Sequence, residues 1–198
     1  MSPVDTRPWL ASIGAGRWQM AGIRSAQRAG INILAMDGDP AAPGLKTANH
    51  SIVVDIRDPH LAIDAAVASG ITLAGAVSFA ADVGLGAVGA LREKFSLPGP
   101  GPSVLKLLTN KAAQRRVWQK AGLKNPVFWK TVEHVDQGLS VIAEAARPLI
   151  VKPVDSAGSR SITRLDTFAS KQVRALAVAF TFFLPSWPSQ RVGGGMLL

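Results

Sequence analysis

The chain has 198 residues, of which 47% are hydrophobic and 18% charged, a composition typical of globular proteins and not of disordered ones. It contains no cysteine, which excludes disulfides, thiolate nucleophiles and zinc–thiolate sites. Its three histidines, His50, His60 and His134, are too widely spaced to form a metal-ligand pair, and we predict no metal site.

The formal net charge of +9 lies in the second half of the sequence. Residues 1–97 carry eight basic and eight acidic side chains, whereas residues 98–198 carry fourteen basic and five acidic ones. The charge leaves nucleic-acid binding open as an alternative, but there is no dense basic run and no interleaving of basic with aromatic residues. A small anionic ligand such as a nucleotide explains the excess at least as well, so we expect no nucleic-acid partner.

Nothing in the sequence indicates secretion or a membrane segment. Residues 1–8 are polar and interrupted by prolines, unlike a signal peptide. The longest apolar run, residues 175–184, is too short to span a bilayer. We therefore expect a cytoplasmic protein without a membrane partner.

Strands and helices alternate through the first half of the chain. Apolar runs predict strands at 9–13, 31–36, 51–54 and 73–79, and helical spacing predicts helices at 17–29, 59–69 and 82–95. Asp58 is the expected cap of the second helix, with Pro59 at its first position. This alternation predicts an α/β fold with a parallel sheet covered on both faces, and we assign residues 1–98 to a Rossmann-like domain.

Gly14 and Gly16 follow the first predicted strand, as in part of the dinucleotide-binding fingerprint. The third glycine of that fingerprint is replaced by Gln19, and two glycines indicate only a tight turn from strand to helix. A Rossmann-type NAD oxidoreductase therefore stays a less favoured alternative. We interpret Asp37 and Asp39 as turn residues and not as ribose ligands.

The segment LPGPGP at residues 97–102 is stiff and rich in turn residues, and it predicts a domain boundary. Beyond it, Asn110 is the expected cap of a helix over 111–120, and Gly122 is its expected C′ residue. The other predicted elements are helices at 103–108 and 134–146, strands at 126–130, 149–151 and 161–163, and a helix capped at Thr167.

The stretch PLIVKPVDSAGSRSITR, residues 148–164, carries the clearest functional signal. A strand ends on Lys152, and a loop of small polar residues follows. Small side chains leave the loop amides accessible to phosphate oxygens, and the lysine adds a positive charge. The alternative is an ordinary β-hairpin with a solvated lysine. The loop residues expected to bind are Asp155, Ser156, Ala157, Gly158, Ser159 and Arg160.

Lys111 opens the predicted helix 111–120, where a cation is mildly unfavourable with the helix dipole. A cation in this place is a weak indication of a nearby anion, although a solvent-exposed lysine is the ordinary explanation. Of Arg115 and Arg116, one can share a helix face with Lys111. We interpret Trp118 as a core residue.

Four segments in order, GAGRWQ, MDGDP, LPGPGPSVLKLLTNKAAQRRVWQKAGLKNP and PLIVKPVDSAGSRSI, resemble the ATP-grasp superfamily. The resemblance is to the branch that includes carbamoyl phosphate synthetase large chains, biotin carboxylase and purine-biosynthetic ligases, and it covers about residues 9–172. It implies a Rossmann-like pre-ATP-grasp domain followed by a two-lobed domain that encloses ATP. Residues 99–172 would then form the first lobe of that second domain.

The resemblance also implies roles for individual residues. Lys111 would contact the nucleotide, Lys152 the phosphates, and the loop from Asp155 to Ser161 would fold over them. Ser161 stands where many relatives have a second glycine, which would make this loop stiffer. The implied enzyme is an ATP-dependent ligase, in which a carboxylate attacks the γ-phosphate and an amine or similar nucleophile opens the acyl phosphate, with magnesium present. We assign no catalytic residue.

After about residue 171 the sequence departs from the family. No acidic residue follows Asp166, so the family's magnesium ligands are absent from this chain. We interpret residues 173–198 as a divergent tail, and the chain as a truncated or frame-shifted ligase that is not active alone. The expected partners are ATP, an unidentified carboxylate, and a homodimer or complementing chain. A nucleotide-binding remnant without chemistry is the alternative.

Overall fold

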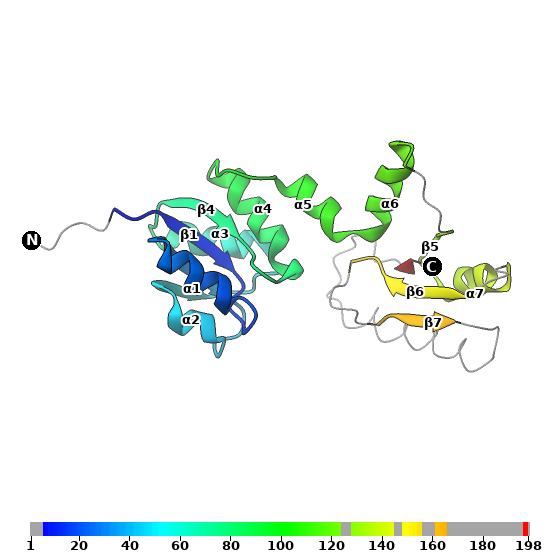
Figure 1. Cartoon of the computed structure of the whole chain (residues 1–198), viewed down its shortest axis with the longest axis horizontal. Coiled ribbons are helices and arrows are strands. Elements are labelled where there is room, and N and C mark those ends of the chain that lie inside the picture. Colours follow the sequence, from blue (N-terminus) through cyan, green and yellow to red (C-terminus); the bar gives the residue numbers. More distant parts are fainter. Residues whose placement is uncertain (1–5, 124–127, 145–147, 156–160, 166–195, 198) are drawn as a thin grey trace, which may run out of the picture. The chain divides into compact units, whose positions relative to one another are not determined.

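A computed structural model describes residues 6–123, 128–144, 148–155, 161–165 and 196–197 (Figure 1). The chain divides into two compact units, Met1–Lys106 and Leu107–Leu198, each containing both helices and strands. The sequence-based boundary at residue 98, between the Rossmann-like domain and the first lobe of the ATP-grasp domain, stays a prediction. In the described ranges, no helix has the length and apolar character needed to cross a membrane.

The first unit is built on a four-stranded parallel sheet in the order β3-β2-β1-β4. Its strands are β1 (Trp9–Ile13), β2 (Asn32–Asp37), β3 (His50–Val53) and β4 (Leu73–Val77). The four predicted strands and their parallel pairing are confirmed, with ends displaced by no more than two residues. Strands β2 and β3 lie on one side of β1 and β4 lies on the other, so the strand order reverses at β1, as in open α/β sheets.

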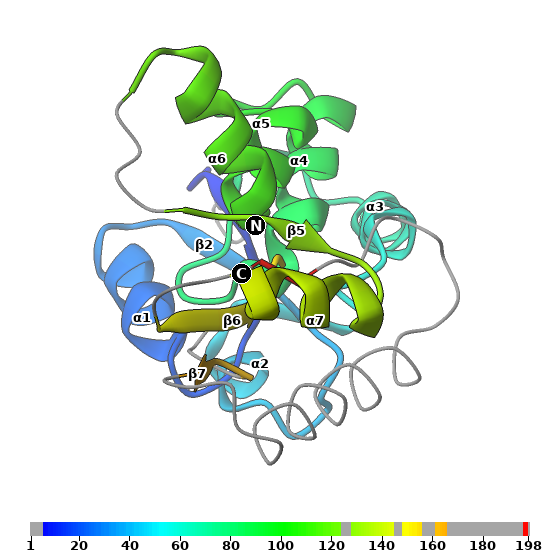
Figure 2. The same ribbon diagram turned by 90° about the vertical axis from the view of Figure 1, so that its right-hand side faces the viewer.

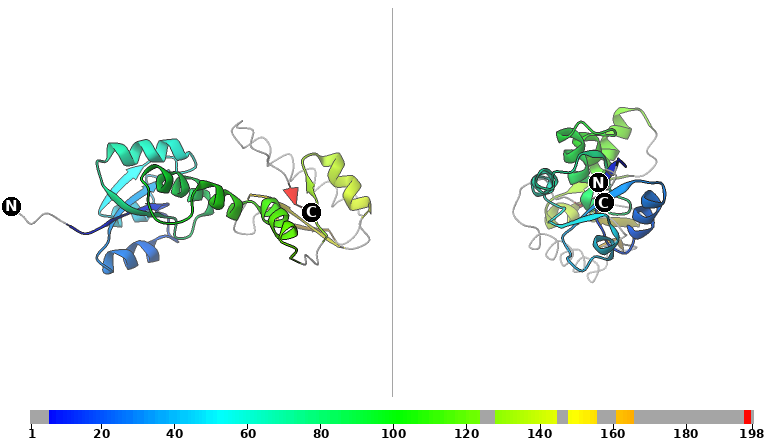
Figure 3. Two further views of the ribbon diagram at one scale, coloured as in Figure 1. Left: turned by 90° about the horizontal axis from the view of Figure 1, so that it is seen from above. Right: turned by 90° about the vertical axis from the view of Figure 1, so that its left-hand side faces the viewer.

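The helices of the first unit cover both faces of this sheet, with α1 and α3 on opposite sides in Figure 3. They are α1 (Met20–Arg28), α2 (Pro43–Thr47), α3 (Pro59–Ala68) and α4 (Leu85–Lys94), with a 3₁₀ turn, η1, at Asp82–Gly84. Helix α5 (Pro102–Thr109) begins in the first unit and ends in the second. The Asp58 carboxylate caps α3 by accepting from the N–H groups of His60 and Leu61, as predicted. The five-residue helix α2 was not predicted, because it is too short to show a helical period.

Side chains of β2 alternate between two cores. Leu34 and Met36 pack with α3 and α4 on one face, and Ile33 and Ala35 pack with α1 and α2 on the other. All four are fully buried. This burial on both faces explains why the strand is a continuous apolar run in the sequence, and it confirms the α/β fold class.

The second unit pairs a small antiparallel sheet with helices (Figure 2). The strand order is β5-β8-β6-β7. The elements are α6 (Lys111–Lys120), β5 (Thr131–Val132), α7 (Val135–Glu144), β6 (Leu149–Pro153), β7 (Thr163–Leu165) and β8 (Met196–Leu197). The cap at Asn110 and the left-handed C′ residue Gly122, with φ +68°, are as predicted.

Several predictions for this unit are wrong. Residues 128–130 are irregular, and the strand expected at 126–130 forms instead at 131–132. Ser161 lies in a turn with φ +57°, so β7 starts two residues later than expected, because a strand requires negative φ. Strand β8 was not expected in the region interpreted as a divergent tail. The helix predicted after Thr167 lies outside the described residues.

Candidate functional site

Helix α6 begins against the end of strand β6. The N–H of Lys111, its first residue, donates to the carbonyl oxygen of Val154 at 2.8 Å. Ala112 and Val154 are buried together, and Trp129 packs against them. This contact brings the start of α6 to the strand that carries Lys152, although the two segments are far apart in the sequence.

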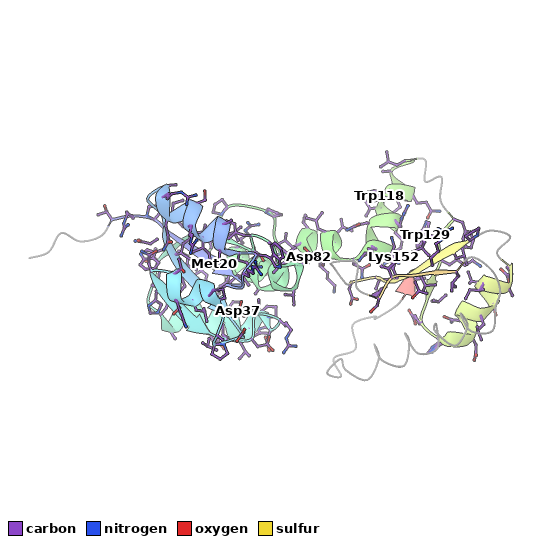
Figure 4. All side chains as sticks on the ribbon, turned by 60° about the horizontal axis from the view of Figure 1, so that its bottom comes forward. Met20, Asp37, Asp82, Trp118, Trp129 and Lys152 are labelled. Carbon is purple, nitrogen blue, oxygen red and sulfur yellow. The ribbon has the colours of Figure 1, made fainter. Side chains whose placement is uncertain are left out.

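Lys152 is half-buried on β6, where Figure 4 labels it. Burial lowers the pKa of its ammonium group, and the positive charges of Arg115 and Lys111 lower it further. We call these three side chains, Lys111, Arg115 and Lys152, the cation cluster. Arg115 and Lys111 are both positive, so a bound anion would favour the charged form of Lys152.

The first amides of α6 already have partners within the protein. Lys111 N–H is taken by Val154, and Ala113 N–H donates to the side-chain oxygen of Asn110 at 2.8 Å. Helix N-termini often bind anions through such amides. Here the attraction for an anion comes instead from the side chains of the cation cluster.

The structure brings together two of the predicted site residues, Lys111 and Lys152. Asp155 is exposed directly after β6, and Ser161 is exposed in the turn before β7. The remaining predicted loop residues, Ser156, Ala157, Gly158, Ser159 and Arg160, lie outside the described residues. Their contact with phosphate stays a prediction.

Arg115 was not singled out from the sequence, which indicated only that it or Arg116 could share a face with Lys111. Arg116 is exposed, whereas Arg115 is half-buried and acts on Lys152. The interpretation of Trp118 as a core residue is wrong, because this side chain is 41% exposed. The Arg115 guanidinium lies over its ring, 5.3 Å from the centroid.

The glycine turn of the first unit is closed by the protein's own carboxylate. Asp37 Oδ2 accepts from the N–H of Ala15 at 2.6 Å, and its Oδ1 accepts from the N–H of Asp39 at 2.9 Å. Figure 4 labels Asp37 in this unit. Asp39 lies in the turn after β2 as expected, whereas Asp37 is the last residue of that strand. Because a carboxylate already holds the Ala15 amide, the turn is poorly suited to a dinucleotide phosphate, which argues against the NAD alternative.

The acidic side chains of the described segments do not form a metal site of their own. Among residues 6–123, 128–144, 148–155, 161–165 and 196–197, no three His, Asp or Glu side chains are grouped closely enough to hold a metal. Magnesium that arrives with a nucleotide is commonly held by one or two carboxylates together with phosphate oxygens and water, and Asp155 is one carboxylate that follows the strand carrying Lys152.

Curated relatives match parts of this chain. A D-alanine–D-alanine ligase of Cupriavidus taiwanensis is 34% identical over 93 residues, 46% of this chain and 27% of the relative. An uncharacterized protein of Sinorhizobium fredii, y4rH, is 35% identical over 86 residues, 43% of this chain and 18% of the relative. The chain therefore spans between about a fifth and a quarter of the length of these relatives. No model of a known protein family matches the chain.

Solved structures match nearly the whole chain. An N5-carboxyaminoimidazole ribonucleotide synthetase in complex with ADP superposes with a TM-score of 0.72 at 18% identity, covering 100% of this chain and 48% of that protein. An L-amino acid ligase from Bacillus licheniformis also reaches 0.72 at 18% identity, covering 96% of this chain and 43% of the ligase. The chain spans about half the length of these proteins.

Proposed function

We propose that this chain, which has the fold of the N-terminal region of ATP-grasp ligases, binds ATP with its phosphates at Lys111 and Lys152. The observation that carries the proposal is the meeting of these two lysines at the joint between α6 and β6. Both were selected from the sequence as nucleotide contacts, and the structure brings them together. The ADP bound by the similar synthetase supports the assignment of the ligand class.

The two lysines would act by position and charge. The α6–β6 contact fixes Lys111 relative to Lys152, so the phosphates would meet charges already in place. Their positive charge would offset the negative charge of the phosphate oxygens during transfer. We further propose that the loop from Asp155 to Ser161 folds over the phosphates.

The proposed reaction is that of an ATP-dependent ligase. A carboxylate would attack the γ-phosphorus of ATP, forming an acyl phosphate and releasing ADP, and an amine or similar nucleophile would then displace the phosphate. Catalysis would depend on a second copy or a complementing chain for its acidic groups. A nucleotide-binding protein without chemistry would use the same two lysines.

Nucleotide titration tests the proposal. We expect the unchanged chain to bind ADP and ATP in isothermal calorimetry, and Lys152→Ala to bind both at least roughly tenfold more weakly, since a charged hydrogen bond to phosphate is lost. Lys130→Ala is the control, because Lys130 is an exposed lysine of the same unit. Equal binding by the two variants, or no binding by the unchanged chain, would contradict the proposal.

ADP release separates the ligase from the binding protein. With ATP present, a mixture of small carboxylates and amines should give carboxylate-dependent ADP in the ligase case, with the unchanged chain or after a complementing chain is added. Tight nucleotide binding with no carboxylate-dependent ADP would favour the protein without chemistry.

A further inference from the structure

We propose that Arg92 holds the segment LPGPGP, residues 97–102, on the first unit, and that this segment is a rigid arm and not a flexible joint. We call residues 97–102 the linker segment. The sequence predicts a domain boundary there, and the proposed nucleotide site gives the segment no role. The inference is carried by hydrogen bonds of the Arg92 guanidinium and by a glycine packed against it, and it does not depend on nucleotide binding.

The sequence of the linker segment leaves its path open. Proline restricts φ at positions 98, 100 and 102. Gly99 and Gly101 stand between these prolines without such a restriction, because glycine has no Cβ atom. The alternation gives short stiff pieces joined at freely rotating residues. Contacts with the rest of the protein must therefore decide which path the segment takes.

The guanidinium of Arg92, on helix α4, supplies two of these contacts. Its Nε donates to the carbonyl oxygen of Ala76 on strand β4 at 3.1 Å. Its Nη1 donates to the carbonyl oxygen of Pro100 at the longer distance of 3.4 Å. Strand β4 is an edge strand of the parallel sheet. One side chain thus connects the edge of the sheet to the middle of the linker segment.

Gly99 packs directly against the same guanidinium. Its φ of +116° is a conformation that L side chains rarely adopt. A Cβ atom at this position would lie 2.7 Å from the Arg92 Cζ atom and 2.8 Å from its Nη1 atom. The absence of a side chain therefore lets the backbone pass close enough to Arg92 for Pro100 to accept its hydrogen bond.

Both ends of the linker segment also contact helix α4. The N–H of Leu97 donates to the carbonyl oxygen of Arg92 at 2.8 Å. At the other end, a Cβ atom on Gly89 would lie only 2.8 Å from the Cα atom of Pro102. Leu105, on the next turn of α5, is buried in the core of the first unit. The arm is therefore held at its start, its middle and its end.

Backbone ¹⁵N relaxation tests the role of Arg92, with the N–H groups of Gly99 and Gly101 as probes. In the unchanged chain we expect order parameters of about 0.85, as in rigid backbone. Arg92→Met removes the donors but keeps a long unbranched side chain, and both order parameters should fall below about 0.6. Lys94→Met is the matched control, because Lys94 is an exposed cation of the same helix, and it should leave both unchanged.

Gly99→Ala and Gly101→Ala form a second matched pair. Gly99→Ala places a methyl group against the guanidinium, so it should lower the order parameter of Gly101 as Arg92→Met does. At Gly101 a Cβ atom would meet nothing within 4 Å, so Gly101→Ala should leave Gly99 ordered. Combining Arg92→Met with Gly99→Ala should lower the order parameter of Gly101 no further than either change alone, since both break the same contact.

Amides of strand β2 serve as the internal reference and should stay ordered in every variant. Order parameters below about 0.6 at Gly99 and Gly101 in the unchanged chain would show a flexible joint and overturn the proposal. If Arg92→Met lowers the midpoint of urea unfolding but leaves both glycines ordered, Arg92 stabilises the fold without holding the arm. Arg92→Lys retains the charge but not the forked donors, so it should restore only part of the order. Full order in that variant would show that the two-carbonyl contact is not what holds the arm.

Discussion

Ser161 has a backbone conformation that serine rarely adopts. Its φ of +57° lies in the left-handed region, which costs an L-residue about 1–2 kcal/mol. Glycine avoids this cost but loses more chain entropy on folding, about 0.5–1 kcal/mol. Ser161 follows the predicted phosphate loop and lies in the turn before β7, so the strained residue is at this turn.

We expect Ser161→Gly to raise the free energy of unfolding by up to about 1 kcal/mol, measured by urea denaturation. Ser103→Gly is the control, because Ser103 lies inside helix α5, where glycine should be destabilising by a similar amount. A loss of stability in both variants would contradict the strain argument.

The lowered pKa of Lys152 makes stability depend on pH in the alkaline range. Between its folded value and about 10.5, the unfolded chain binds more protons at this lysine than the folded chain does. The free energy of unfolding therefore increases as pH rises through that window. Below the window, the charged Lys152 lowers the stability of the folded state. Added nucleotide should cancel the effect by stabilising the charged form.

We expect Lys152→Met to show a smaller increase in stability than the unchanged chain as pH rises toward 10.5, measured by urea denaturation at each pH. Lys130→Met should retain the original slope, because that lysine is exposed. The same slope in all three proteins would show that the cation cluster does not act on Lys152 as described.

At the scale of elements, the cap of α6 is the part on which the site depends. Asn110 accepts from the N–H of Ala113 and fixes the first turn, which carries Lys111. Asn110→Ala should lower the free energy of unfolding by about 1 kcal/mol and weaken ATP binding, since the first turn frays. Asn110→Ser retains a side-chain acceptor and should preserve most of both. If Asn110→Ala lowers stability but leaves ATP affinity unchanged, the site does not depend on this cap.

Apart from the short helix α2, the elements of the first unit could be predicted because each has a sequence signal of its own. Buried parallel strands give apolar runs, and Asp58 followed by Pro59 marks a helix start. The second unit has strands of two to five residues, too short for alternation to be read. The positive φ of Ser161 also moved β7 away from its predicted start.

The candidate site was predictable only in part for a different reason. Lys111 and Lys152 have a motif around them, whereas the choice between Arg115 and Arg116 depends on how α6 rotates against β6. The Asp37–Ala15 hydrogen bond likewise joins loops that follow two neighbouring strands. Side chains that meet through tertiary packing leave no local pattern in the sequence.

At the scale of the whole molecule, most of the excess positive charge lies in the part of the chain that also carries the candidate site. Residues 1–97 balance eight basic with eight acidic side chains, and residues 98–198 carry the entire excess of positive charge. The cation cluster lies in the second unit, while the first provides a parallel sheet with two well-packed cores. Binding at the cluster should weaken as ionic strength rises, because its three side chains are only half-buried and salt still screens their charges.

Strand β8 sets the order in which the second unit can be assembled during synthesis. Residues 196–197 lie between β5 and β6 in the sheet, with Leu197 opposite Lys152 and Met196 opposite Pro153. Such long-range pairing is slow, and it cannot begin until those residues have left the ribosome. The parallel sheet of residues 9–77 can form much earlier. The strand pairing beside Lys152 is therefore completed only after residues 196–197 have emerged, later than the parallel sheet of the first unit.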